Sequence, residues 1–195
     1  MKYIILDTET TGTDPVRNGI IQLSGNIIIP TKDHEVVFID EPFDLKMQPF
    51  PADIIEDSAL AVTGTTREEL ATRMLCFDGY KEFTRLLGRH ISKFDRSDKA
   101  FMVGYNIGFD DSFLRQWFQK AGDRYFGSWF WWPPIDVAVL AAMKLRDRRA
   151  ELPDFKQGTV AKALGIEVDE TRQHNALYDV NICRQIYNVC TGEAL

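Results

Sequence analysis

Residues 3–14 read YIILDTETTGTD, an apolar run that ends in two acids followed by small polar residues. The β-branched, apolar residues predict a strand over 3–6. A strand this apolar is typically central and covered on both faces of its sheet, so a site would form at its carboxyl end. If the strand continues through Asp7 and Glu9, these side chains project from the same face. A D-x-E pattern alone is weak, since Asp33 and Glu35 match it in a predicted turn.

The composition bounds the class of protein. The 195 residues are 45% hydrophobic and carry a formal net charge of −6, which predicts one domain over residues 1–195 with its own core. No apolar stretch is long enough to span a membrane and the N-terminus lacks signal-peptide features, so we expect a cytoplasmic protein with no membrane partner. The acidic balance argues against a broad basic surface, but not against a phosphate substrate held through cations.

The cysteines carry no metal or disulfide signal. They are odd in number and lack paired metal-ligand spacing, so we expect reduced core residues; they are Cys76, Cys183 and Cys190.

The order of predicted elements indicates an α/β fold with a mixed sheet. Three strands come first, and strands then alternate with helices. The predicted strands cover residues 3–6, 19–29, 35–40 and 100–106, with a looser strand and helix over 134–147. The predicted helices cover 51–75 with a break at Gly64, then 79–91, 109–122, 156–166 and 175–190. Thr65 or Thr66, followed by Glu68 and Glu69, has the pattern of a helix start.

Two further acids point inward by helical spacing. Asp110 shares a stripe with Phe113, Leu114 and Trp117, whereas Asp111 lines up with Arg115 and Gln119 and is expected to face water. Asp179 lies on an apolar or amphipathic stripe formed by Cys183, Ile186, Tyr187 and Cys190. Buried carboxylates need a basic partner or a cation. For several acids from distant segments, a shared site for Mg²⁺ or Mn²⁺ is the better account.

His174 precedes Asp179 by five residues, so the two share no helical stripe unless His174 lies on the preceding loop. A histidine there could accept a proton beside a metal site. An ordinary surface histidine is the alternative, because His90 and Asp95 match the same spacing.

Together these motifs resemble the DEDDh 3′-to-5′ exonucleases, the family of polymerase proofreading subunits, oligoribonuclease and ribonuclease T. DTETTG, YNIGFDDSFL and QHNALYDV match its three motifs in order, and ALAVTGTTREEL, PPIDVAVLA and TVAKALGI match the segments between them. One departure is Tyr105-Asn106, where the family commonly has His-Asn. This position is outside the metal shell, so we expect it to alter substrate contacts or packing.

The resemblance implies a ribonuclease H-like mixed β-sheet flanked by helices. It implies that Asp7, Glu9, Asp110 and Asp179 hold two divalent ions, Mg²⁺ or Mn²⁺, and that His174 is the general base. The reaction would release nucleoside 5′-monophosphates from the 3′ end of single-stranded DNA or RNA, in proofreading, repair or RNA trimming. The substrate contacts it implies are Thr10, Thr11, Gly12, Tyr105 and Asn106, with Phe109 as a core residue or contact and Asp136 as a support for the site.

The sequence also permits other hypotheses about the function. The fold could serve as a non-catalytic module that binds nucleic acid or a polymerase, or as a metal phosphohydrolase acting on small phosphodiesters. A DNA polymerase or a second copy of the chain are the protein partners considered. The aromatic cluster Trp129 to Trp132 favours packing or a protein interface over base stacking. The basic run over 144–149 fits a solvated helix end and a phosphate guide equally well.

Overall fold

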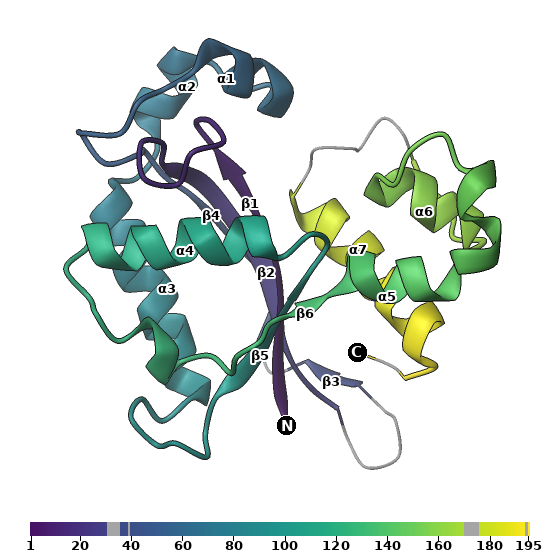
Figure 1. Cartoon of the computed structure of the whole chain (residues 1–195). Helices are drawn as coiled ribbons and strands as arrows, with labels where there is room; N and C mark the ends of the chain where they lie inside the picture. The colour runs from purple at the N-terminus through teal and green to yellow at the C-terminus, as the bar shows by residue number, and fades with distance from the viewer. Residues whose placement is uncertain (31–35, 39, 170–175, 194) are drawn as a thin grey trace.

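The computed structural model describes residues 1–30, 36–38, 40–169, 176–193 and 195. Within them, six strands form one mixed sheet (Figure 1): β1 (Lys2–Thr10), β2 (Ile20–Pro30), β3 (Val36–Phe38), β4 (Phe43–Lys46), β5 (Ala100–Gly104) and β6 (Ile135–Asp136). The order is β3-β2-β1-β5-β6, and β4 pairs with β2. β1 runs antiparallel to β2 and parallel to β5, which is parallel to β6. The predicted mixed α/β sheet is therefore confirmed.

β1 is the central strand and both of its faces are covered. Ile4 and Leu6 belong to a core with residues of α3 (Cys76–His90) and α4 (Gly108–Lys120). Ile5, between them, belongs to a second core with residues of α5 (Val137–Lys144), α6 (Gln157–Ala163) and α7 (Ala176–Thr191). Figure 1 shows these two helical layers on opposite sides of the sheet. Because successive side chains of a strand point to opposite faces of the sheet, β1 contributes side chains to both cores.

The predicted break in the helical segment after residue 51 is confirmed. α1 (Asp57–Thr63) ends at Gly64, whose φ of 65° is left-handed and favours glycine. α2 (Arg67–Thr72) begins after Thr66, and the Glu69 backbone N–H donates to the Thr66 hydroxyl. Two short 3₁₀ helices, Phe126–Ser128 and Arg146–Glu151, lie in the later connections.

Other features follow from the described residues. Cys76 and Cys183 are buried, as expected of core residues, whereas Cys190 is half-buried; all three are free thiols. Among the described helices, none has the length and apolarity needed to cross a membrane. β4 was not predicted; its Phe43 and Leu45 are buried while the residues after each are exposed.

Candidate active site

Asp7 and Glu9 lie on β1, which continues to Thr10. The condition for both side chains to project from the same face of the strand is therefore met. Thr8 and Thr10 are buried, whereas Asp7 and Glu9 between them are partly exposed. The two carboxylates therefore project from one face, the face of Ile5 and the α7 layer.

Asp110 lies in the first turn of α4 and is 3% exposed. Its Oδ1 accepts hydrogen bonds from the Thr8 backbone N–H at 2.9 Å and the Thr8 hydroxyl at 2.7 Å. These bonds join the start of α4 to the carboxyl half of β1. The inward orientation predicted for Asp110 is confirmed.

The pKa values of Asp7, Glu9 and Asp110 are all raised above their ordinary values. Burial, followed by the charges of Asp110, Glu9 and Asp179, raises the pKa of Asp7 well above its ordinary value. Burial, then Asp179 and Asp110, raises the pKa of Glu9 to about 7. Burial also raises the pKa of Asp110 to about 7, although the Thr8 hydrogen bonds oppose the shift. Asp7 and Glu9 on β1 thus lie near enough to Asp110 on α4 and Asp179 on α7 for the charges to interact.

This donor set fits hard divalent cations. Of the described Lys and Arg side chains, none forms an ion pair with Asp7, Glu9 or Asp110. As they stand, no three Asp, Glu, His or Cys side chains of the described segments are gathered closely enough to hold an ion. Binding would therefore draw the side chains together, and a cation would relieve the repulsion that contributes to the raised pKa of Asp7 and of Glu9.

Asp136 supports the turn that precedes α4. Its Oδ1 caps α5 by accepting from the Ala138 N–H at 2.9 Å, and it also accepts from the Asn106 N–H at 3.1 Å. Asn106 is exposed with a φ of 60°, a conformation that Asn tolerates better than most residues. The Tyr105 hydroxyl donates to the Phe155 carbonyl at 2.6 Å. Tyr105 therefore has a packing role, while Asn106 is open to a ligand.

The segment after Glu9 is a tightly bonded loop. Thr11 is fully buried, and its hydroxyl donates to the Ile54 carbonyl at 2.6 Å. A Cβ on Gly12 would lie 2.4 Å from the Asn18 side chain, so glycine is required by close approach. Asn18, 1% exposed, donates to the Ile54 carbonyl and to Glu56 Oε1. Sequence reasoning missed Asn18, whose only signal is its position after a turn.

Substrate contact in this loop stays a prediction for Thr10, Thr11 and Gly12. The Thr10 hydroxyl donates to the Gly12 carbonyl at 2.7 Å, and Thr10 is 8% exposed. His174, the predicted general base, lies outside the described residues.

The expectation for Asp111 is wrong. Asp111 is 7% exposed, although it pairs with Arg115 as the helical spacing indicated, at 2.7 Å. The Arg115 guanidinium lies over the rings of Phe126 and Trp132, which belong to the connection after α4. Arg115 and these rings shield the Asp111 side chain from water. Asp111 Oδ1 is buried without a hydrogen-bond partner.

The aromatic cluster divides between core and surface. Trp129 and Phe130 are 4% exposed and pack in the core, as expected, whereas Trp132 is 71% exposed. Phe109 is partly buried against the core, with its ring 4.8 Å from that of Phe113.

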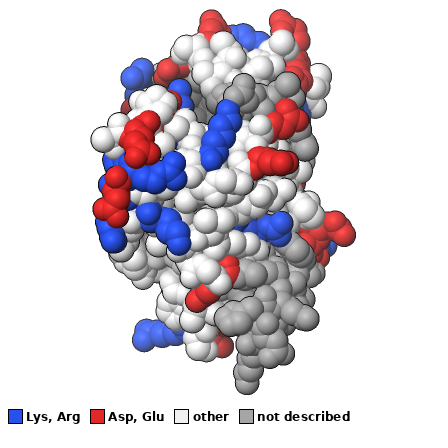
Figure 2. All heavy atoms as spheres, turned by 90° about the vertical axis from the view of Figure 1, so that its right-hand side faces the viewer, with Lys and Arg blue, Asp and Glu red and all other residues white. Residues whose placement is uncertain are grey.

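The basic run over 144–149 lies among acids. Arg148 pairs with Glu151 at 3.2 Å and Arg146 lies 3.7 Å from Asp147. Across the side of the molecule shown in Figure 2, Lys and Arg alternate with Asp and Glu. This arrangement favours the solvated helix end over a continuous phosphate guide.

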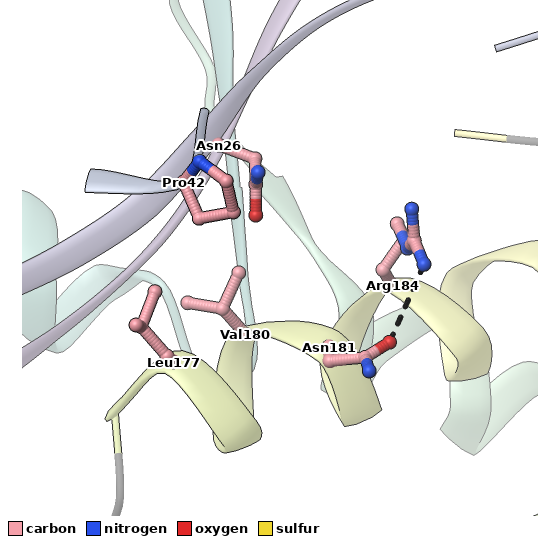
Figure 3. A pocket seen from close by; sticks show the side chains of 6 residues that line it. All are labelled: Asn26, Pro42, Leu177, Val180, Asn181 and Arg184. Carbon is pink, nitrogen blue, oxygen red and sulfur yellow. Dashed lines mark hydrogen bonds between the residues drawn. The ribbon is translucent and has the colours of Figure 1, made fainter. Parts of the chain in front are cut away.

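A pocket of about 210 Å³ lies between α7 and the side chains of Asn26 and Pro42 (Figure 3). It is lined by Asn26, Pro42, Leu177, Val180, Asn181 and Arg184. The α7 residues lie three and four apart on one helical face, roughly opposite Asp179. This pocket is therefore separate from the acid site.

Comparison with known proteins identifies the class. A family model for exonucleases matches residues 4–187. The chain belongs to this exonuclease family, and the family resemblance expected from the sequence is confirmed.

Two proteins similar in sequence and one similar in structure illustrate the family. DNA polymerase III PolC-type of Bacillus cereus is 29% identical over 177 residues, which cover 91% of this chain and 10% of that protein. Ribonuclease T of Hahella chejuensis is 26% identical over 180 residues, covering 90% of this chain and 77% of that protein. A zinc-bound E. coli exonuclease I–single-stranded DNA complex matches with a TM-score of 0.76 at 21% identity, over 98% of this chain and 40% of that one. The chain thus spans about a tenth of the PolC-type relatives, and the structural match confirms the ribonuclease H-like fold.

Proposed function

We propose that the chain is a divalent-metal-dependent 3′-to-5′ exonuclease acting on single-stranded DNA or RNA and releasing nucleoside 5′-monophosphates. The observation that supports this most strongly is that Asp7 and Glu9 lie near Asp110 and Asp179: burial and the charges of these acids raise the pKa of Asp7 and Glu9, and burial raises the pKa of Asp110. Exonucleases of this family depend on divalent metal. We propose that the four acids hold two ions, Mg²⁺ or Mn²⁺.

The chain's own residues have distinct proposed roles. When bound, the ions would neutralise the acids and stabilise the negative charge of the reacting phosphate. Thr8 holds the Asp110 carboxylate in a fixed orientation through two hydrogen bonds. Asp136 fixes the turn that leads into α4. His174 is the proposed general base that takes the proton of the attacking water.

Substrate and partners are proposed more broadly. The names of the relatives include a DNA polymerase and a ribonuclease, and exonuclease I has been solved with a dT13 oligonucleotide. They support single-stranded DNA or RNA as the substrate and a DNA polymerase as a partner, and self-association stays a prediction. We further propose one exonuclease domain over residues 1–195, and the cytoplasmic location stays a prediction.

The test is a time course on 5′-labelled single-stranded DNA and RNA oligomers, with Mg²⁺ or Mn²⁺, with chelator, and with Asp7→Ala. A ladder that shortens from the 3′ end, and is lost with chelator and in Asp7→Ala, is expected. Intact oligomers under every metal condition, in a protein shown to be folded, would overturn the proposal. Cleavage of small phosphodiesters alone would then favour the phosphohydrolase, and binding without cleavage the non-catalytic module.

A further inference from the structure

Lys120, the last residue of α4, joins this helix to the loop that follows Glu9 and β1. Its ammonium donates to the Asn18 backbone carbonyl at 2.7 Å and to Asp53 Oδ1 at 2.5 Å. The Lys120 and Asp53 side chains are only 21% and 2% exposed. We call these two contacts of Lys120 the lysine bridge.

On the loop side, the lysine bridge reaches the segment predicted to contact substrate. Asn18 is 1% exposed, and its Oδ1 accepts from the Asp14 N–H at 2.9 Å. The next residue, Gly19, accepts from the Thr11 N–H at 2.9 Å and donates its own N–H to the Thr11 hydroxyl at 2.9 Å. Because these bonds cross the loop, the position of Asn18 determines the position of Thr11.

Asp53 connects the lysine bridge to the segment before α1. Its Oδ2 accepts from the Phe50 N–H at 2.9 Å, which fixes the carboxylate within its own turn. Three residues after Asp53, the Glu56 N–H donates to the Thr11 carbonyl at 2.9 Å. Lys120 therefore contacts two segments that also bond each other at Thr11.

α4 is attached to β1 and its loop at both of its ends. Asp110, in the first turn, accepts two hydrogen bonds from Thr8 of β1. Lys120, ten residues later, bonds the loop after β1. Ten residues of helix span about 15 Å at about 1.5 Å per residue. A rigid helix anchored at these two points sets the distance between the Asp110 carboxylate and the loop.

A covered lysine–carboxylate pair adds little stability by itself. Taking two charges out of water costs about as much as their attraction returns, and an uncharged pair of similar size is often equally stable. We propose that Lys120 is a positioning residue that holds residues 10–12 at a fixed place relative to Asp110. This inference rests on the proposed exonuclease function, in which residues 10–12 contact the terminal nucleotide. A displaced loop weakens contacts made equally in the ground state and the transition state, so KM rises while kcat changes little.

The test replaces both charges of the lysine bridge with uncharged side chains of similar size, in Lys120→Met/Asp53→Asn. The matched control is Lys93→Met/Asp123→Asn, whose wild-type side chains are 26% and 11% exposed and lie 2.9 Å apart. The control pair joins the connection before β5 to the segment after α4. Hydrolysis of a 12-mer and of a dinucleotide is measured with Mn²⁺, amide hydrogen exchange is measured in chelator without substrate, and urea unfolding establishes that both variants are folded.

We expect the Lys120→Met/Asp53→Asn variant to raise KM about 5- to 30-fold on both substrates, with kcat within about twofold of the unmodified value. The amides of residues 11–19 should also exchange faster in this variant. The control should leave KM and the exchange of these amides unchanged. Equal KM values for the two double variants would overturn the inference, because the lysine bridge would then serve stability alone. A higher KM on the 12-mer alone would also overturn it, because the effect would lie away from the terminal nucleotide.

The exchange measurement separates this inference from the proposed function. If the unmodified protein cleaves neither substrate, the exonuclease function fails. Faster exchange over residues 11–19 in the Lys120→Met/Asp53→Asn variant, but not in the control, would still support the positioning of the loop by Lys120. Unchanged exchange would overturn it.

Discussion

Replacing Glu9 with glutamine is expected to stabilise the metal-free protein at alkaline pH while abolishing nuclease activity. Burial and the charges of Asp179 and Asp110 raise the pKa of Glu9 to about 7, from an ordinary value of 4.5. The folded protein therefore keeps this proton up to about pH 7, whereas the unfolded chain releases it near pH 4.5. As pH rises through that interval the native state loses stability, and the penalty is fully present above about pH 7.

The magnitude follows from the two pKa values. A shift of about 2.5 units at about 1.4 kcal/mol per unit corresponds to about 3 kcal/mol at pH 8 and about 1 kcal/mol at pH 5. Glutamine keeps the size of the side chain and never ionises. Glu9→Gln should therefore raise the free energy of unfolding by up to about 3 kcal/mol at pH 8, and by much less at pH 5.

Urea unfolding in chelator at pH 5 and pH 8 measures this difference through the linear dependence of the free energy on denaturant. Glu68→Gln, on the exposed surface of α2, is the matched control and should change stability equally at both pH values. An identical effect of Glu9→Gln at the two pH values would contradict the raised pKa, because it would mean that Glu9 ionises freely in the folded, metal-free protein.

Three further substitutions give distinct outcomes. Asp7→Asn should lower kcat on 5′-labelled oligomers on the order of a thousandfold or more with an unchanged circular dichroism spectrum; retained activity would remove Asp7 from the reaction. Gly12→Ala should cost about 1–3 kcal/mol by urea unfolding, because the new Cβ meets the Asn18 side chain, and adding Asn18→Ser should recover part of that loss; additive losses would contradict the close approach. Thr66→Ala should cost about 1 kcal/mol through the lost bond from the Glu69 N–H, and an unchanged urea midpoint would show that this cap is not formed.

Much of the site could be predicted because its signals are local. Asp7 and Glu9 follow an apolar strand, and strand alternation alone places them on one face. Asp110 lies on an apolar helical stripe, which predicts its burial. The helix break at Gly64 follows from glycine's tolerance of positive φ.

The rest depends on contacts between segments distant in sequence. Asp111 was expected in water, and it is buried because Arg115 lies against Phe126 and Trp132 from another connection. Asn18 has a structural role only because residues 54–56 pack against its loop. The hydrophobic periodicity of a single segment therefore predicts neither the burial of Asp111 nor the structural role of Asn18.

Asp7, Glu9, Asp110 and Asp179 are proposed to bind divalent cations. The most direct measurement is a crystal structure of the protein grown with Mn²⁺, with anomalous difference maps collected at the manganese edge. We expect anomalous peaks bounded by these carboxylates, and their loss in Asp7→Asn crystals. Fully occupied Mn²⁺ peaks elsewhere, with none among the four acids, would contradict it.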